Sequence, residues 1–244
     1  MGSAMAAPSE TKPMRFYAAQ YFYLKNGSQP ARIHEYLKNG AIPTLKRAGA
    51  GPPLVLEALV APHMPQIAVF FGAPSFESIA NIHSKVTADP EWRKQFAAWE
   101  TGDEPAVESM SVTLLEAAPY SPALAADAEP RKTPRIFELR VYHAPTARQL
   151  EALHQRFADA EIGIFLCSCI HPVLYSSTLV GPMMPNLTYV IPFDNLDARE
   201  KGWAKFGADP EWVKVRKESI DKYGQITTTI QISLWKATAY SPVG

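Results

Sequence analysis

The chain repeats itself once over most of its length. The pentapeptide Ala88-Asp89-Pro90-Glu91-Trp92 returns at positions 208–212, and Tyr120-Ser121-Pro122 returns at 240–242, so both pairs are 120 residues apart. Because the register is kept without a gap, the sequence indicates an internal duplication. The repeated unit is longer than the ~20 to 50 residues of solenoid or propeller repeats. We therefore expect two domains and not a stack of small modules.

The duplication predicts the domain boundaries. Residues 1–14 form a tail that opens with Met1-Gly2-Ser3-Ala4-Met5, which resembles a cloning remnant. The first domain is expected at 15–122, a linker at 123–134 and the second domain at 135–244. An apolar fraction of 47% in 244 residues is enough for each domain to bury its own core.

The charge balance bears on possible partners. The chain has 24 Lys plus Arg and 24 Asp plus Glu, so no net field attracts nucleic acid or an acidic membrane. No apolar run approaches the ~20 residues that span a bilayer, and we expect no transmembrane segment. The small, polar residues 6–10 are typical of the region after a removed signal peptide. A soluble protein is expected, and both the cytoplasm and export stay open.

The two cysteines, Cys167 and Cys169, are two positions apart. A helix would point them about 200° apart, so a disulfide between them would be strained. Together with His171 they supply too few ligands for a structural metal ion. The sequence predicts two free thiols and no metal site.

Each copy has the pattern strand, helix, strand, strand, helical region, strand. In the second copy, strands are expected at 135–143, 173–180, 187–193 and 225–236, and helices at 146–168, 195–206 and 210–223. In the first copy, strands are expected at 16–24, 53–60, 66–71 and 108–116, and helical regions at 30–47 and 76–99.

This order is typical of a ferredoxin-like unit, in which helices cover one face of a four-stranded antiparallel sheet. The other face must also be covered, and the duplication supplies a second sheet to cover it. We therefore predict an α+β fold in which two tandem ferredoxin-like units pack their sheets into one pseudo-twofold α/β barrel.

Three segments of the second copy resemble the NIPSNAP family. The strand Ile136-Phe137-Glu138-Leu139-Arg140-Val141-Tyr142 resembles the family's YELRxY opening strand. Residues 197–203 followed by 208–212 are similar to its AxREExW and ADPEW segment, and 239–242 is similar to its closing turn. In the first copy, Ala18-Ala19-Gln20-Tyr21-Phe22 replaces the Glu-Leu-Arg core.

The resemblance covers nearly the whole chain from Arg15, as two tandem copies. It implies the dimeric α/β-barrel superfamily, which agrees with the predicted fold. It implies no particular activity, because that superfamily includes cofactor-free monooxygenases, haem-handling enzymes, isomerases and non-catalytic binders.

The alternation of the strands predicts a polar lining between the two sheets. Glu138, Arg140 and Tyr142 are expected to face this space, together with Thr227, Thr229, Gln231 and Ser233. Buried polar groups cost stability unless they are paired, so a cavity that holds water or a ligand is favoured over direct pairing across strands. The predicted ligand contacts are Gln20, Phe22, Ser111, Thr113, Tyr175, Thr229 and Gln231.

Glu138 and Arg140 are the polar pair with the most clearly defined candidate catalytic role. A carboxylate shielded from water can act as a base while a guanidinium holds an anionic or enolate oxygen. Ala18 and Gln20 occupy the matching positions of the first copy, so at most one half carries this pair. The candidate catalytic residues are Glu138, Arg140, Tyr142 and, at the end of the same strand, His143.

Two repeated features have structural explanations. His34 and His154 occupy matching helix positions, where they either fill the seam between helix and sheet or act as a pair that shuttles protons. Asp89 and Asp209 are predicted to cap the helices that follow them. We expect no cofactor, although His143 or His171 could serve as an axial haem ligand of the kind that some superfamily relatives use.

Three functions stay open. The first is a NIPSNAP-type protein that binds a small, partly apolar molecule in the polar-lined barrel. The second is a cofactor-independent monooxygenase or isomerase that uses Glu138, Arg140 and Tyr142, and the third is a scaffold that acts through its surface. A homodimer is possible because related single-domain proteins pair, although the duplication can satisfy that need within one chain.

Overall fold

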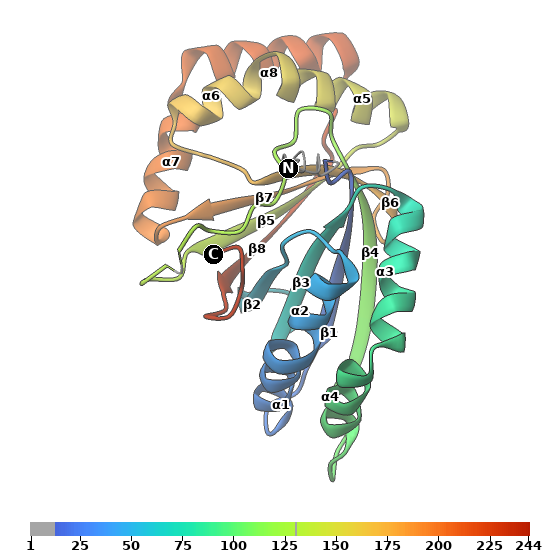
Figure 1. The fold of residues 1–244 in the computed structure, drawn as a ribbon. Coiled ribbons are helices and arrows are strands. Elements are labelled where there is room, and N and C mark those ends of the chain that lie inside the picture. Colours follow the sequence, from blue (N-terminus) through green and yellow to red (C-terminus); the bar gives the residue numbers. More distant parts are fainter. Residues whose placement is uncertain (1–12, 130) are drawn as a thin grey trace, which may run out of the picture.

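The computed structural model describes residues 13–129 and 131–244. Eight antiparallel strands close into one barrel, in the order β1-β3-β2-β8-β5-β7-β6-β4 around its wall (Figure 1). Positions 1–12 of the predicted tail lie outside the described residues. The predicted α+β barrel of two ferredoxin-like units is confirmed.

The two copies contribute matching elements. The first contains β1 (Phe16–Tyr23), α1 (Gln29–Tyr36), the π-helical turn η1 (Leu37–Ala41), α2 (Ile42–Ala48), β2 (Leu54–Val60), β3 (Gln66–Ala73), α3 (Phe76–Ala88), α4 (Pro90–Glu100) and β4 (Ser109–Ala117). The second contains β5 (Ile136–His143), α5 (Ala147–Arg156), η2 (Phe157–Glu161), α6 (Ile162–Cys167), β6 (Leu174–Val180), β7 (Asn186–Phe193), α7 (Leu196–Ala208), α8 (Pro210–Tyr223) and β8 (Thr229–Ala237).

Most element boundaries lie within one or two residues of the prediction, and two differences are larger. The long helix expected at 146–168 is interrupted by a π-helical turn at 157–161, and the first copy has the same turn at 37–41. The last strand begins at Thr229 and not at 225, because Gly224 ends α8 with a φ of 75° and Thr228 N–H donates to the carbonyl of His143.

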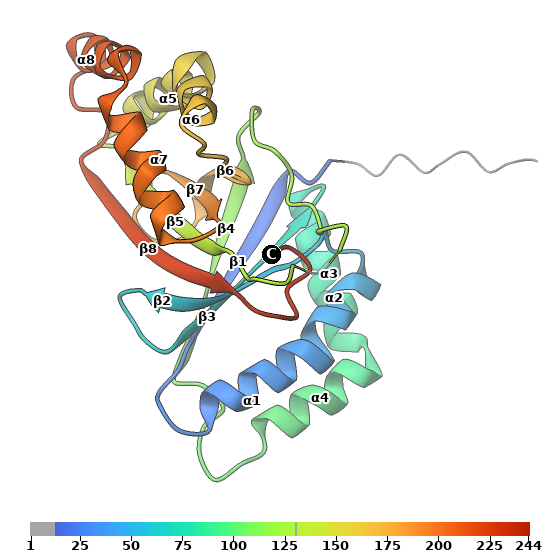
Figure 2. The same ribbon diagram turned by 90° about the vertical axis from the view of Figure 1, so that its left-hand side faces the viewer.

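The barrel closes through two seams between the copies. β2 pairs with β8 and β4 pairs with β6, both antiparallel, with Leu56 opposite Ala237 and Leu115 opposite Thr178. The helices of the two copies lie on opposite sides of the barrel (Figure 2). Each sheet therefore has one face against its own helices and the other face against the opposite sheet.

Apolar side chains from both copies fill part of the barrel interior. Tyr17, Phe70, Phe137 and Trp235 are almost completely buried there and belong to one continuous cluster. Two further clusters lie between each sheet and its helices. The core of the barrel is shared, whereas the core under each set of helices comes mostly from one copy.

The repeated Tyr-Ser-Pro segments bind the opposite copy. The hydroxyl of Tyr120 lies 2.7 Å from Nδ1 of His154, and the hydroxyl of Tyr240 lies 2.8 Å from Nδ1 of His34. The serine that follows each tyrosine also contacts the opposite copy. Ser121 Oγ accepts from Tyr175 N–H at 2.8 Å, and Ser241 Oγ accepts from Val55 N–H at 2.9 Å. We call these two tyrosine–histidine contacts the clasps. They explain why the chain repeats Tyr-Ser-Pro.

The Ala-Asp-Pro-Glu-Trp repeats are helix starts, as predicted. Asp89 Oδ1 accepts from Trp92 N–H at 2.9 Å, and Asp209 Oδ1 accepts from Trp212 N–H at 3.1 Å. Each aspartate thus pairs a backbone donor that the helix itself leaves free.

Candidate functional site

One part of the barrel interior is hollow. The cavity has a volume of about 190 Å³, far more than the ~10 to 15 Å³ that one water needs. Pro62 and the pair Pro182 and Met183, from the β2–β3 and β6–β7 turns, are among the residues that border it. Every residue that lines it is uncharged, and the polar ones are Tyr21, Tyr23, Gln66, Ser111, Thr113, Thr178, Asn186, Thr188, Gln231 and Ser233.

Asn186 anchors one polar wall of this cavity. Its Oδ1 accepts hydrogen bonds from the hydroxyls of Thr178 and Thr188, at 2.9 and 3.0 Å. Its Nδ2 donates to the carbonyl of Met183 at 2.9 Å. Because Asn186 is completely buried and fully paired, it holds the β6–β7 turn against the cavity wall.

Other polar groups in the lining have free hydrogen-bonding capacity. Tyr21, Gln66, Thr113 and Gln231 line the cavity, and their side chains have no hydrogen-bond partner among the residues that the structure describes. Burial raises the pKa of the Tyr21 phenol, so its hydroxyl stays a donor at neutral pH. The Tyr21 ring is fixed by Trp235, with the ring centroids 6.3 Å apart. The cavity therefore combines an aromatic wall with unpaired donors and acceptors.

The polar wall at Asn186 is not repeated in the first copy. The positions that match Thr178, Asn186 and Thr188 in the first copy are Ala58, Gln66 and Ala68. Both threonines are therefore replaced by alanine there. The two halves of the cavity are therefore chemically different, although they share one fold.

The prediction that Glu138, Arg140 and Tyr142 face the barrel interior is wrong. Leu139 and Val141 line the cavity instead, and the three polar side chains lie on the outer face of β5, under the helices. The period of two along a strand defines two faces, but it does not say which of them points inward. The apolar face of β5 points inward because it completes the core that both copies share.

Helix α7 supplies the partners of Glu138. This carboxylate is completely buried, and Oε2 accepts from Arg199 Nε at 2.5 Å and from Trp203 Nε1 at 3.1 Å. Oε1 accepts from Arg140, whose guanidinium lies 3.8 Å from the centroid of the Trp203 ring and donates to the hydroxyl of Tyr142 at 2.7 Å. Arg199 and Trp203 are four residues apart on one helix face, and this spacing is the signal that would have indicated the orientation of Glu138.

The other predicted site residues divide into two groups. Ser111, Thr113 and Gln231 line the cavity. The inward orientation predicted for Phe22 and Tyr175 is wrong, because both pack under the helices of their own copies, and Gln20 does not line the cavity either. Thr229 is the exposed first residue of β8, and His143, which ends β5, does not line the cavity.

A second buried polar cluster lies near Tyr142. Glu161 ends the π-helical turn η2, is 1% exposed, and accepts from Arg156 Nε at 2.9 Å. Burial raises the pKa of Glu161 to about 7, which outweighs the opposite effect of Arg156. The hydroxyls of Tyr175 and Tyr189 are buried in the same layer without partners in the described part of the chain. Ala41, Val55 and Val69 occupy the positions of Glu161, Tyr175 and Tyr189 in the first copy.

Comparison with known proteins agrees with this fold. The model of the NIPSNAP family matches residues 137–242. The second copy therefore matches the NIPSNAP family, and we call it the NIPSNAP domain. A comparison with curated proteins gave no match.

Solved structures resemble the chain over its full length or over about half of it. A candidate monooxygenase from Lactobacillus acidophilus NCFM has a TM-score of 0.56 and 10% identity, covering 92% of this chain and 94% of its own. An anthrone oxidase-like protein has a TM-score of 0.56 and 13% identity, covering 94% and 92%. A NIPSNAP family protein of unknown function from Agrobacterium tumefaciens C58 has a TM-score of 0.41 and 21% identity, covering 47% and 97%. At these identities the two full-length likenesses show the fold alone.

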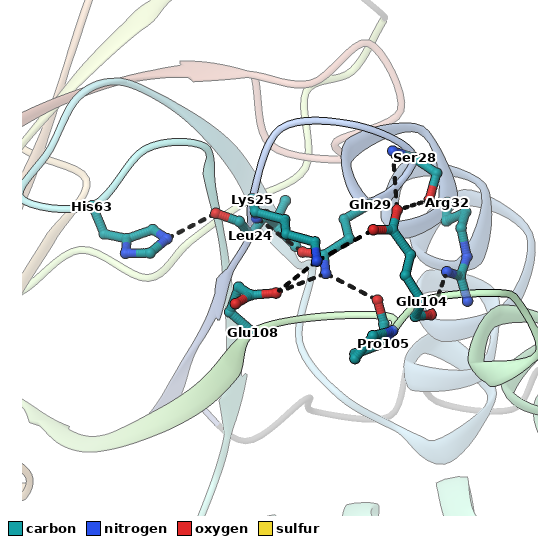
Figure 3. Close-up of polar contacts among 9 residues, drawn as sticks. All are labelled: Leu24, Lys25, Ser28, Gln29, Arg32, His63, Glu104, Pro105 and Glu108. Carbon is teal, nitrogen blue, oxygen red and sulfur yellow. Dashed lines mark hydrogen bonds and ion pairs between the residues drawn. The ribbon is translucent and has the colours of Figure 1, made fainter.

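A third polar cluster, in the first copy, is structural. Figure 3 shows Glu104 and Glu108, from the segment before β4, reaching Lys25, Ser28 and Gln29 at the start of α1. Gln29 is completely buried and donates to the carbonyl of Pro105 at 2.9 Å. Because these groups pair with one another, the cluster ties the segment to the helix and does not form a binding site.

The residues that the structure describes contain neither a metal cluster nor a membrane-spanning helix. Within residues 13–129 and 131–244, no three His, Cys, Asp or Glu side chains lie close enough together to hold a metal ion. Cys167 and Cys169 are exposed free thiols, as predicted. No helix in the same ranges has the length and apolar character needed to cross a membrane.

We predict that Glu138→Ala destabilises the NIPSNAP domain strongly. The substitution leaves Arg140, whose side chain is only 12% exposed, without a carboxylate, and it leaves Arg199 with the exposed Glu200 as its remaining carboxylate partner. Breaking a buried ion pair from one side costs about 3 to 5 kcal/mol. The control is Glu116→Ala, which removes the partner of the 66% exposed Arg15 and should cost less than about 1 kcal/mol. Equal losses in urea unfolding would contradict a buried role for Glu138.

We predict that Glu161 makes the stability of the protein fall as pH rises from about 4.5 to about 7. Its pKa is about 7 in the folded protein against 4.5 in the unfolded chain, so the folded state binds more protons in this window. The full cost above the window is about 3 kcal/mol. The free energy of unfolding, measured with urea, should fall between pH 4.5 and pH 8 by about this much more in the wild type than in Glu161→Gln. Identical pH dependence in the two proteins would refute the raised pKa.

Proposed function

We propose that the barrel cavity binds a small, uncharged and partly apolar molecule. The observation that carries the proposal is the hollow of about 190 Å³, in which the aromatic side chains Tyr21 and Trp235 meet the unpaired polar groups of Gln66, Thr113 and Gln231. A concave site with an apolar wall and a few convergent polar groups is typical of ligand pockets. Water or a ligand would supply the missing hydrogen bonds.

The lining argues for a neutral ligand and for binding over chemistry. An ion in this cavity would lose its hydration without gaining a charged partner, which costs several kcal/mol. Among the residues that line the cavity, none has a carboxyl, imidazole or thiol group that could act as an acid or base near neutral pH. The Tyr21 hydroxyl is a hydrogen-bond donor for a carbonyl or ether oxygen of the ligand.

We predict that Thr113→Phe blocks the cavity. Thr113 lines the cavity, whereas its neighbour Val112 is 50% exposed and points outward. The probe is N-phenyl-1-naphthylamine, an uncharged aromatic molecule whose fluorescence rises on transfer from water to an apolar site. Thr113→Phe should weaken its binding at least about tenfold, or ~1.4 kcal/mol. Val112→Phe is the matched control and should leave the affinity unchanged.

Native mass spectrometry of the purified wild-type protein complements this titration. A retained small molecule that is missing from Thr113→Phe and present in Val112→Phe would support the proposal and identify the ligand by its mass. Equal probe affinity in all three proteins, with no retained mass in any of them, would refute it.

We propose as a second candidate a cofactor-independent oxygenase or isomerase in the helix–sheet layer of the NIPSNAP domain. The unpartnered buried hydroxyls of Tyr175 and Tyr189 favour it, since they lie in one layer with the Glu138–Arg140–Tyr142 network. Glu161 has the pKa of a general base, and Arg140 could hold an enolate oxygen. Substrate would have to open this packed layer.

Anthrone is a suitable probe for this candidate, because one structural neighbour is described as anthrone oxidase-like. Removal of a proton from C10 gives an enolate, and its reaction with O₂ yields anthraquinone and water, which balances the atoms. Oxygen uptake with anthrone should be lost in Arg140→Ala and retained in Gln20→Ala, the matching position of the first copy. Absence of uptake, or the same uptake in both variants, would refute an oxygenase at this site.

A further inference from the structure

We propose that Ser177 is the nucleophile of a separate site that hydrolyses small acyl esters on the outer side of β6. The Oγ atom of Ser177 lies 2.7 Å from Nε2 of His154, and Nδ1 of the same imidazole lies 2.7 Å from the hydroxyl of Tyr120. A hydroxyl, an imidazole and a third group that orients the imidazole form the arrangement that activates serine nucleophiles. The barrel cavity plays no part in this site.

The site is open to small molecules. Ser177 and His154 line a surface depression of about 500 Å³, which Arg15 and Glu116 of the first copy also line. The Arg15 side chain is 66% exposed, and Glu116 Oε1 accepts from its Nε at 2.9 Å. A guanidinium in the depression can stabilise the negative charge that develops on the acyl oxygen during attack. The two copies therefore contribute different parts of one site.

The protonation states suit this role. Burial lowers the pKa of His154, so the imidazole is neutral at pH 7 and can accept a proton. Burial raises the pKa of the Tyr120 phenol, which therefore stays neutral as well. When the Tyr120 oxygen accepts Nδ1–H, the lone pair of Nε2 faces the Ser177 hydroxyl. The Tyr120 ring is held by Tyr175, with the ring centroids 5.4 Å apart.

The first copy has the same clasp but lacks the proposed nucleophile. His34 and Tyr240 make the same contact at 2.8 Å, so a histidine–tyrosine pair joins the copies on both sides. The residue on the other side of the imidazole differs, since Glu57 stands where the second copy has Ser177, with 3.9 Å between Oε1 and His34 Nε2. A clasp requires no serine, and the second copy differs by placing a serine hydroxyl against Nε2 of its histidine, where the first copy has Glu57.

The proposed reaction balances with water as the second reactant. Ser177 Oγ attacks the acyl carbon while its proton passes to His154 Nε2. The C–O bond to the leaving alcohol breaks as Nε2 returns the proton to that oxygen, which leaves an acyl ester on Ser177. Water then attacks the acyl carbon, its proton passes through Nε2 to Ser177 Oγ, and the carboxylic acid is released.

A fluorophosphonate, which reacts with activated serines by losing fluoride, tests the proposal on the full chain. Peptide mass spectrometry should find the label on Ser177, and Ser177→Ala should remove it. His154→Gln should slow labelling at least about 100-fold, the contribution expected of a general base. The matched control, His34→Gln, removes the equivalent clasp and should leave the labelling rate unchanged. Tyr120 is a positioning residue, so Tyr120→Phe should slow labelling whereas Tyr240→Phe should not.

The rate of p-nitrophenyl acetate hydrolysis should rank the variants in the same order as the labelling rate does. Circular dichroism checks that each variant is folded. Failure to label Ser177 in the folded wild-type protein would overturn the proposal. Labelling that falls equally in His154→Gln and His34→Gln would overturn it too, because the histidine would then act only through the clasp.

Discussion

The structure depends on burying the inner faces of two sheets against each other. Each four-stranded sheet has helices on one side only, and the opposite face carries side chains as large as Tyr17, Phe70, Phe137 and Trp235. The two seams, β2 with β8 and β4 with β6, pair the edge strands and remove every free sheet edge from the barrel. Apolar burial and edge pairing therefore require both copies at once.

The fused chain allows the two halves to differ in a way that identical subunits cannot. Every substitution in a symmetric dimer appears twice, so a polar wall on one side would be matched on the other. Here Asn186 and its two threonine partners line one side of the cavity, opposite a first copy with two alanines at the matching positions. Burying polar groups costs stability, and the asymmetry limits that cost to one copy.

The two copies also differ in the buried polar groups between their helices and sheets. Glu138 and Glu161 lie buried with their arginine partners in the second copy, where the first has Ala18 and Ala41. The family match and these two buried carboxylates thus fall in the same half of the chain. The two buried carboxylates of the second half have no counterpart at the matching positions of the first half, although both halves build the barrel.

The sequence predicted the architecture better than it predicted the site. The constant offset and the order of strands and helices were enough for the barrel, because both are local patterns whose packing has few solutions. The inward direction of Gln231 and Ser233 was correct, and that of Glu138 was wrong. Alternation on β5 allowed either face to point inward, and the deciding partners, Arg199 and Trp203, lie about 60 residues further along the chain.

The clasps have a consequence for how the molecule assembles. Helix α1 is among the first elements to be synthesised, yet the tyrosine that binds its His34 lies 206 residues later. The chain thus forms a ring in which an early segment and a late segment meet. Contacts of such long range are costly in loop entropy and form late, which slows folding. They also couple the two copies, so the protein should unfold as one cooperative body and not as two independent domains.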